Sequence, residues 1–252
     1  MEISFLGTGT STGVPEIGCQ CEVCTSSDKR DWRLRTSVLV ETDGKQFLLD
    51  CGPDFRWQMI RNKTYHLDAV LISHEHYDHV GGLDDLRPFC REKGVDVYAE
   101  DNVAEAIETR IPYVFRTQKY PGVPNLELHR IGNEPFVVAG IQVTPVRVMH
   151  GKLPILGYRI GNMAYLTDVK YLPEEEYAKL EGLDVLILTA LRRGPHPTHE
   201  SLEEALVNVG RIRPKETYLI HMSHRIGLHA VVEKELPPHV HLAYDGLRVY
   251  CP

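Results

Sequence analysis

Apolar residues occur along this chain in short runs and alternations, and turn residues separate them. Alternation, or an unbroken apolar run of a few residues, predicts a β-strand. Asp43-Gly44 is typical of a tight turn, so the runs on either side of it are predicted to form a hairpin. The first half is therefore predicted to contain strands at Glu2 to Leu6, Arg35 to Glu41, Lys45 to Asp50, Leu67 to Ile72 and Val95 to Ala99, and helices at Pro53 to Arg61, His79 to Glu92 and Asn102 to Arg110.

The second half of the chain shows the same mixture of strand and helix patterns. Leu126 to Met149 alternates apolar positions with turn residues, which indicates several strands of a second sheet. Two further hairpins are expected, with turns at Gly161-Asn162 and Asp245-Gly246. Their strands are Leu156 to Ile160 with Met163 to Thr167, and His241 to Tyr244 with Leu247 to Tyr250. Other predicted strands are Val185 to Thr189 and Thr217 to Ile220; predicted helices are Glu174 to Lys179, Glu200 to Arg211 with Thr198 as its cap, and Leu228 to Glu235.

Each half thus supplies strands and flanking helices. This order predicts an α/β fold in which two mixed β-sheets form a sandwich between helical layers, with functional residues at strand ends. A chain of 252 residues can form one large domain or two small ones. Because no linker or repeat interrupts it, we expect a single domain over residues 1–252.

Composition narrows the class of protein. The net charge of -7 disfavours general binding to nucleic acid or to an anionic membrane. The sequence shows no long apolar segment and no signal-peptide pattern, so we expect a cytoplasmic protein. Its expected partner is a small molecule, and a homodimer is the commonest assembly for such an enzyme.

The segment from Ser73 to His79 carries the strongest chemical signal. Five of its seven residues bear an imidazole or a carboxylate, the groups that bind zinc, iron or manganese. A turn between a strand and a helix can direct His74 and His76 to one point and Asp78 and His79 to another. The spacing therefore favours two metal ions over a solvated histidine-rich turn.

Three cysteines, Cys19, Cys21 and Cys24, form a second cluster. Three thiolates at this spacing can hold three corners of a tetrahedral zinc site, although three free thiols are the alternative. The glycine-rich loop from Gly7 to Gly13 lacks the Lys-Ser/Thr of a P-loop and is interpreted as a tight turn near an active site.

The motif His74-x-His76-x-Asp78-His79 resembles the signature of the metallo-β-lactamase superfamily, and the resemblance extends over essentially the whole chain. Asp50 before the motif, and His150, Asp168 and His221 after it, stand in the order of that superfamily. The resemblance implies that Asp50 supports the metal ligands. It also implies two divalent metal ions, with manganese and zinc as the first candidates and iron and nickel as the others. By the same resemblance, one ion is bound by His74, His76 and His150, and the other by Asp78, His79 and His221. Asp168 would bridge the two ions.

Within this superfamily the chain looks like the PhnP-type phosphodiesterases. In these proteins a histidine three residues after an active-site histidine completes the structural zinc site of the triple cysteine, and this position is His224 here. The resemblance also identifies His199 as a general acid, since it lies 22 residues before His221. A histidine with a pKa of roughly 6 to 7 suits that role. His196 on the same loop is the other candidate, and Arg192 and Arg193 are either anion-binding or solvated.

The resemblance implies a dinuclear metal-dependent phosphodiesterase that hydrolyses a small cyclic phosphodiester such as phosphoribosyl cyclic phosphate. A metal-bridging hydroxide would attack, and His199, Asp78 and Asp168 are the expected catalytic residues. A tRNase Z-like nuclease and a glyoxalase II-like thioester hydrolase are the alternatives. A PqqB-like protein without hydrolytic activity ranks lower, because the metal-binding pattern here is complete.

Overall fold

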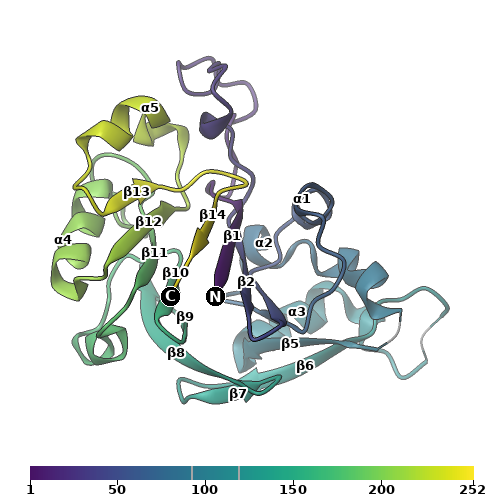
Figure 1. Cartoon of the computed structure of the whole chain (residues 1–252). Coiled ribbons are helices and arrows are strands. Elements are labelled where there is room, and N and C mark those ends of the chain that lie inside the picture. Colours follow the sequence, from purple (N-terminus) through teal and green to yellow (C-terminus); the bar gives the residue numbers. More distant parts are fainter. Residues whose placement is uncertain (92, 119) are drawn as a thin grey trace.

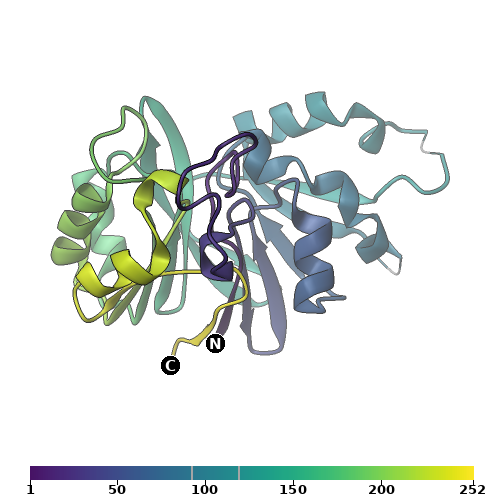
Figure 2. The same cartoon turned by 90° about the horizontal axis from the view of Figure 1, so that it is seen from above.

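The computed structural model of the chain describes residues 1–91, 93–118 and 120–252, and in this part the strands form two seven-stranded sheets. The sheets pack face to face, and helices cover their outer surfaces (Figures 1 and 2). Each sheet contains both parallel and antiparallel pairs, so the predicted sandwich of two mixed sheets between helical layers is confirmed.

The first sheet is built mainly from the N-terminal half of the chain. Its strands lie in the order β14-β1-β2-β3-β4-β5-β6. The pairs from β14 to β3 are antiparallel, and those from β3 to β6 are parallel. The strands are β1 Glu2–Gly7, β2 Ser37–Thr42, β3 Lys45–Leu49, β4 Ala69–Leu71, β5 Val95–Glu100, β6 Leu126–Ile131 and β14 Arg248–Tyr250.

The second sheet comes from the C-terminal half, in the order β13-β12-β11-β10-β9-β8-β7. Its pairs are antiparallel from β7 to β10 and parallel from β10 to β13. The strands are β7 Phe136–Val138, β8 Ile141–His150, β9 Leu153–Ile160, β10 Met163–Leu166, β11 Val185–Thr189, β12 Glu216–Ile220 and β13 Val240–Leu242.

Helices and short 3₁₀ segments connect these strands. The α-helices are α1 Phe55–Asn62, α2 Tyr77–Val80, α3 Asp101–Arg110, α4 Leu202–Ile212 and α5 His229–Val232. The 3₁₀ segments are η1 Lys29–Asp31, η2 Leu83–Cys90, η3 Pro112–Val114, η4 Glu174–Leu180, η5 His224–Ile226 and η6 Glu233–Glu235.

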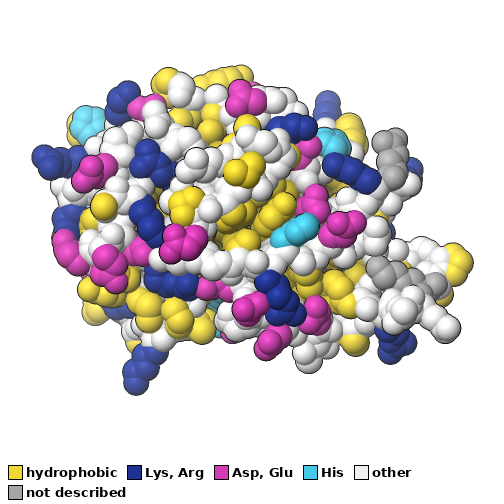
Figure 3. All heavy atoms as spheres, turned by 90° about the horizontal axis from the view of Figure 1, so that it is seen from below, with side chains coloured by type: hydrophobic (Ala, Val, Ile, Leu, Met, Phe, Trp, Pro, Cys, Tyr) yellow, Lys and Arg dark blue, Asp and Glu magenta, His cyan; other side chains and the backbone are white. Residues whose placement is uncertain are grey.

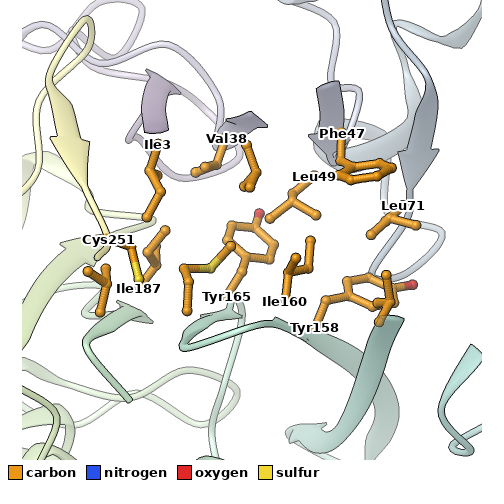
Figure 4. Packing of buried hydrophobic residues seen from close by; sticks show 14 of the residues in the cluster. Ile3, Val38, Phe47, Leu49, Leu71, Tyr158, Ile160, Tyr165, Ile187 and Cys251 are labelled. Atoms are coloured by element: carbon orange, nitrogen blue, oxygen red, sulfur yellow. The ribbon is translucent and has the colours of Figure 1, made fainter. Parts of the chain in front are cut away.

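The core between the sheets follows from the two-residue period of a strand. On β3, Phe47 and Leu49 point into the space between the sheets, and Leu48 between them packs on the opposite face under the helices. Across that space, Tyr158 of β9 and Tyr165 of β10 are fully buried (Figure 4). Each sheet therefore buries both of its faces, which explains the continuous apolar runs in the sequence.

Two predictions about strand pairing were wrong. The last two strands do not form a hairpin, because β13 pairs with β12 in the second sheet and β14 pairs with β1 in the first. The carboxylate of Asp245 is buried and accepts hydrogen bonds from Thr8 and the backbone of Leu34, so the chain crosses between the sheets there. Likewise β6, expected in the second sheet, extends the first by pairing with β5.

The helix predictions also need correction at two places. Helix α4 begins at Leu202, and its cap is Ser201, which forms a capping box with Glu204, rather than Thr198. The segment predicted as helical from His79 is split at Gly81-Gly82 into α2 and the 3₁₀ segment η2. A Cβ on Gly82 would lie 2.1 Å from the carbonyl oxygen of Gly52, so this break allows close packing of two loops. Glu92, the predicted end, lies outside the described residues.

The lower face of the molecule carries acidic and basic side chains interspersed around hydrophobic ones (Figure 3). The net charge of -7 is therefore not gathered into one acidic field on this face. Among the described residues, no helix has the length and apolar character needed to span a bilayer.

Candidate metal centre

Several residues predicted to bind or support metal lie at or just after the ends of strands, and three of them have left-handed backbone conformations. Asp50 after β3, Asp168 after β10 and His221 after β12 have φ angles of 61°, 55° and 56°. This conformation is uncommon for residues with a Cβ atom and persists where the surroundings fix it. The sharp change of direction turns each side chain out of its strand toward a common point.

The first cluster contains His74, His76 and His150 with one oxygen of Asp168. The Nε2 atom of His74 lies 2.9 Å from Nδ1 of His76. Oδ2 of Asp168 lies 3.9 Å from Nε2 of His74 and 4.0 Å from Nε2 of His150. These separations leave room for a cation among four ligand atoms.

The second cluster contains Asp78, His79 and His221. Oδ2 of Asp78 lies 3.2 Å from Nε2 of His79 and 3.4 Å from Nε2 of His221. The other oxygen of Asp168, Oδ1, lies 3.4 Å and 3.3 Å from the same two nitrogens. The Asp168 carboxylate thus stands between the clusters, with one oxygen toward each.

Hydrogen bonds behind the clusters orient several of these rings. Nδ1 of His79 lies 2.8 Å from Oδ2 of Asp50, which also accepts hydrogen bonds from Ser73 and Tyr165. Nδ1 of His150 lies 2.8 Å from the carbonyl oxygen of Thr198. Since each contact occupies Nδ1, the Nε2 atoms of His79 and His150 are left facing the clusters. Asp50 therefore occupies the supporting position that the sequence predicts.

A buried atom without a partner tests whether these residues fit a metal ion. Nε2 of His79 is buried and makes no well-oriented hydrogen bond with a described residue, although carboxylate oxygens of Asp78 and Asp168 lie 3.2 and 3.4 Å from it. A buried polar atom without a partner is costly, and coordination to a cation would satisfy it. Imidazole nitrogens together with carboxylate oxygens form a donor set that suits zinc, manganese and iron. The residues therefore fit a pair of divalent metal ions.

The electrostatics of the centre favour carboxylates in their charged form. Burial alone would raise the pKa of Asp168, but His221 and His79 hold it well below its usual value. Burial also opposes ionisation of Asp78, and the neighbouring His79 and His221 again lower its pKa. The pKa of His74 is well below its usual value because of burial and the nearby His79. Anionic carboxylates and the neutral imidazole of His74 are forms that bind cations. Burial opposes the charge of His79, but the carboxylates of Asp168 and Asp50 raise its pKa well above the usual value, so a cation bound there must displace its proton.

His199 lies at the junction of the two clusters. Its Nε2 atom is 3.1 Å from Oδ2 of Asp168, and its ring stacks on His221 with the centroids 5.0 Å apart. Burial lowers the pKa of His199 to about 4, although the hydrogen bond with Asp168 acts in the opposite direction. The pKa therefore departs from the ordinary histidine value that the sequence argument assumes. His196, the other candidate, contacts His199, with 3.2 Å between their Nδ1 atoms.

The three clustered cysteines meet His224 in a separate site. The sulfur atoms of Cys19, Cys21 and Cys24 lie 3.1, 3.4 and 3.3 Å from Nδ1 of His224. A backbone hydrogen bond from Cys24 is the main cause that lowers the pKa of Cys21 to about 6, which favours its thiolate, whereas burial raises the pKa of the neighbouring Cys24 to about 12. Nε2 of His224 lies 3.6 Å from a carboxylate oxygen of Glu16. The structure thus brings together four groups suited to a tetrahedral zinc ion, with a carboxylate behind the histidine.

Sequence reasoning missed several supporting residues. Ser73 contacts both Asp50 and Nδ1 of His74, and Tyr165 donates to Asp50. Ser73 directly precedes the histidine motif, so its hydroxyl was a visible signal, whereas the contact of Tyr165 depends on the packing of the two sheets. Arg193 is paired with Glu235, which places it in a surface ion pair.

A family model and a solved structure agree on the family to which this chain is similar. Residues 45–222 match the family model described as "Beta-lactamase superfamily domain". A solved structure described as a new diphosphatase from the PhnP family is 41% identical, with a TM-score of 0.92, and the match covers 98% of this chain and 96% of that one.

Two curated relatives carry different names. An octanoyltransferase of Porphyromonas gingivalis is 51% identical over 98% of this chain, but this chain spans only 51% of that protein's length. A coenzyme PQQ synthesis protein B of Methylorubrum extorquens is 34% identical over 74% of this chain and 72% of its own length. One fold thus serves proteins of different names, so the activity must be argued from the site.

Proposed function

We propose that this chain, a metal-dependent hydrolase that belongs to the β-lactamase superfamily, hydrolyses a small phosphodiester. The observation that carries the proposal is the position of Asp168. Its two carboxylate oxygens face two different sets of ligand atoms, and His199 lies beside one of those oxygens.

In this proposal His74, His76 and His150 hold one divalent ion, and Asp78, His79 and His221 hold a second. Asp168 contributes one oxygen to each. Two ions held by these residues would supply an activated water for attack at phosphorus and would neutralise charge on the phosphoryl oxygens. Manganese and zinc both suit these ligands, and iron or nickel are further candidates.

His199 then serves the leaving group. It reaches the junction of the clusters from the loop before α4 and is only 13% exposed at its side chain, so it is shielded from bulk water. From this position its imidazole, once protonated, can deliver a proton to the departing oxygen of a substrate held at the centre. Because burial lowers the pKa of free His199 to about 4, this role requires that the negative charge of a bound phosphodiester raise that pKa. The contact between its Nε2 atom and Asp168 holds the ring at the centre.

A small phosphodiester is the substrate class that we propose for this centre. A phosphodiester carries one negative charge, and a cyclic ribose phosphate is small enough for a shielded centre. The PhnP-family relative named as a diphosphatase supports a phosphorus–oxygen bond as the target, so a substituted diphosphate belongs to the same class. We place phosphoribosyl cyclic phosphate among the candidate substrates.

The cluster of Cys19, Cys21, Cys24 and His224 has a separate role. We propose that it holds one structural zinc ion, which fastens the loop of residues 19–24 to the turn after β12. A site of four protein ligands leaves no open position for a substrate, which distinguishes it from the dinuclear centre.

Thioester or acyl chemistry is the second candidate function. The relative named as an octanoyltransferase favours it, although this chain corresponds to about half of that protein. The same hydrolytic centre would accept an activated acyl carbon, since superfamily sites serve several reactions.

The decisive experiment measures turnover by the purified protein after reconstitution with manganese. The panel contains bis(4-nitrophenyl) phosphate, a cyclic ribose phosphate, a substituted diphosphate, an acyl thioester and 4-nitrophenyl phosphate. We expect turnover of the diesters and little turnover of the thioester or the monoester. Thioester turnover without diester turnover would replace the proposal by the second candidate.

A further inference from the structure

The turn after β12 carries one residue of each proposed metal site. His221 faces Asp78 and Asp168 of the dinuclear centre. His224, three residues later, lies 3.1 to 3.4 Å from the sulfur atoms of the cysteine cluster. Only Met222 and Ser223 stand between the two histidines. A change at the cysteine cluster is therefore three residues away from a proposed ligand of the catalytic centre.

Hydrogen bonds connect this turn to two other segments of the centre. The backbone N–H of Met222 donates to the carbonyl oxygen of Thr8 at 3.0 Å, which joins the turn to the loop after β1. The backbone N–H and the hydroxyl of Ser223 both donate to the carbonyl oxygen of Leu191, at 2.8 and 2.9 Å. Leu191 in turn bonds through its N–H to the residue that follows His199. The turn thus supports both a proposed metal ligand and the loop of the proposed general acid.

Two cysteines of the cluster are spaced as a pair that can form a disulfide. The N–H of Thr25 donates to the carbonyl oxygen of Cys21 at 3.0 Å and closes one helical turn, so Cys21 and Cys24 lie on the same side of it. The ligand atoms of the whole cluster lie within 4.8 Å of one another. Residues three positions apart on a helical turn meet the Cα separation that a disulfide requires. Two cysteines separated by two residues are also the common arrangement of redox-active pairs.

The cysteine cluster lies at the surface, where a dissolved oxidant can reach it. The loop that carries it projects from the top of the molecule beside α5 (Figure 1), and Ile17 in this loop is fully exposed. Cys19 and Cys21 are half-buried. In contrast, Cys51 and Cys251 are 0% and 1% exposed. The clustered thiolates are therefore more accessible than these core cysteines.

We propose that Cys21 and Cys24 form a site of oxidative modification, at which hydrogen peroxide converts two zinc-binding thiolates into a disulfide. The Cys21 thiolate attacks one oxygen of the peroxide, the O–O bond breaks, and a sulfenic acid and a hydroxide ion result. The Cys24 thiolate then displaces a second hydroxide from the sulfenic acid and forms the S–S bond. The two sulfur atoms together lose two electrons, and the peroxide is reduced to two hydroxide ions. The inference rests on the proposed zinc site, and its effect on turnover rests on the proposed function.

Oxidation at this site acts on the catalytic centre through the turn after β12. A disulfide removes two of the four zinc ligands, so the zinc ion is released and His224 loses its tie to the cysteine loop. The turn then depends more heavily on the hydrogen bonds of Met222 and Ser223, and it opens more often. Because His221 begins this turn and the loop of His199 is bound to it, both side chains are held less firmly. Oxidation thus lowers turnover, and reduction in the presence of zinc restores it.

Zinc release and disulfide mapping test the modification without any turnover. Protein that holds manganese in the dinuclear centre and zinc at the cysteines is treated with hydrogen peroxide and passed through a gel-filtration column. Its metal content is measured, and its alkylated peptides are analysed by mass spectrometry. We expect the loss of zinc together with a disulfide between Cys21 and Cys24, both reversed by dithiothreitol and added zinc. Retention of zinc, or its loss without this disulfide, would overturn the proposal.

Two variants locate the oxidation within the cluster. Cys21→His keeps four groups that can bind zinc but cannot form the disulfide, and we expect it to release zinc at least tenfold more slowly than the parent. Cys90→Ser, at a half-buried cysteine outside the cluster, is the matched control and should behave as the parent does. Release from Cys21→His at the parent's rate, or protection by Cys90→Ser, would exclude the proposed pair. The disulfide map of the parent decides the question if Cys21→His holds no zinc before treatment.

Hydrogen exchange tests the connection to the catalytic centre. After oxidation we expect the amides of Met222 and Ser223 to exchange at least tenfold faster, and those of α3, which packs on β5 and β6, to stay unchanged. Diester turnover should fall at least fivefold and recover on reduction with zinc. Unchanged exchange and turnover after complete loss of zinc would overturn the connection. Zinc release and the disulfide in a protein that turns over no diester before treatment would contradict the proposed function, while the modification site stands.

Discussion

The Nε2 atom of His199 lies 3.1 Å from Oδ2 of Asp168, the same carboxylate oxygen that faces His74 and His150. The other oxygen of Asp168 faces His79 and His221. One carboxylate therefore joins both proposed metal sites to the proposed general acid. Substitutions at Asp168, at the cysteine site and at His199 should therefore change different measurable properties of the protein.

Substitution of Asp168 should remove the connection between the two metal sites. We expect Asp168→Ala to lose at least one bound ion per chain and to reduce diester turnover by at least a thousandfold, because neither ion keeps its full set of ligands. Metal analysis after gel filtration, together with initial rates, checks this. Asp101→Asn, at a side chain that is 78% exposed, is the control. Unchanged turnover in Asp168→Ala would contradict the two-metal mechanism.

Substitution of Cys21 should separate the structural site from the catalytic one. We expect Cys21→Ser to lose one zinc ion and to unfold at a lower temperature, because zinc binding contributes to the free energy of folding. The ions of the dinuclear centre should remain. Cys90→Ser, at a half-buried cysteine outside the cluster, should keep the parent's metal content. Equal zinc content in Cys21→Ser and the parent would show that the cysteine cluster is not a zinc site.

The effect of replacing His199 on the hydrolysis rate should depend on the leaving group of the substrate. We expect His199→Ala to slow hydrolysis of an alkyl diester by roughly 10²- to 10⁴-fold, the range of general acid catalysis. An activated nitrophenyl diester should be slowed much less, because its leaving group departs without a proton. Steady-state rates on the two substrates, with the exposed His239→Ala as control, measure the difference. The same loss on both would indicate a binding or structural role.

The stability of the protein should fall in mild acid partly because of His229. This residue is 3% exposed, and burial together with the nearby Arg33 lowers its pKa to about 4. The folded state thus binds fewer protons than the unfolded state, so this contribution is present above pH 6.5 and is lost as the pH falls toward 4. After an allowance for solvent screening, we expect a loss of about 2 kcal/mol.

Urea unfolding at pH 7 and pH 4.5 measures this loss. In His229→Gln the fall in the free energy of unfolding should be smaller than in the parent by about that amount, about 2 kcal/mol. Acid release of zinc affects both proteins, so the comparison isolates His229. An identical fall in both would exclude the histidine as the source.

The local part of the centre was predictable because its information lies within a few residues. His74, His76, Asp78 and His79 share one strand-to-helix turn, so their spacing alone indicates how they can converge. The triple cysteine is local in the same sense. The more distant residues His150, Asp168, His221 and His224 were identified through family resemblance, and the structure brings each of them to the cluster expected for it.

Errors arose where a sequence pattern is compatible with more than one partner. Asp245-Gly246 signals a turn, but the burial of Asp245 against Thr8 and Leu34 sends β14 to the first sheet. The alternation of apolar residues in β6 predicts a strand but does not determine which strand it pairs with, and in the structure this is β5. Thr198 and Ser201 are both suitable caps, and only the path of the loop decides that Ser201 begins α4.

The sequence by itself determined the strands, the layered α/β architecture and the kinds of ligand, because these depend on periodicity and on side-chain chemistry. Only the tertiary structure decided how Asp168 divides its two oxygens between the clusters and how Tyr165 reaches Asp50. It also joined the backbone of Met222 to that of Thr8. These relationships join residues far apart in the chain, and the packing of two sheets, rather than any local pattern, sets the distances between them.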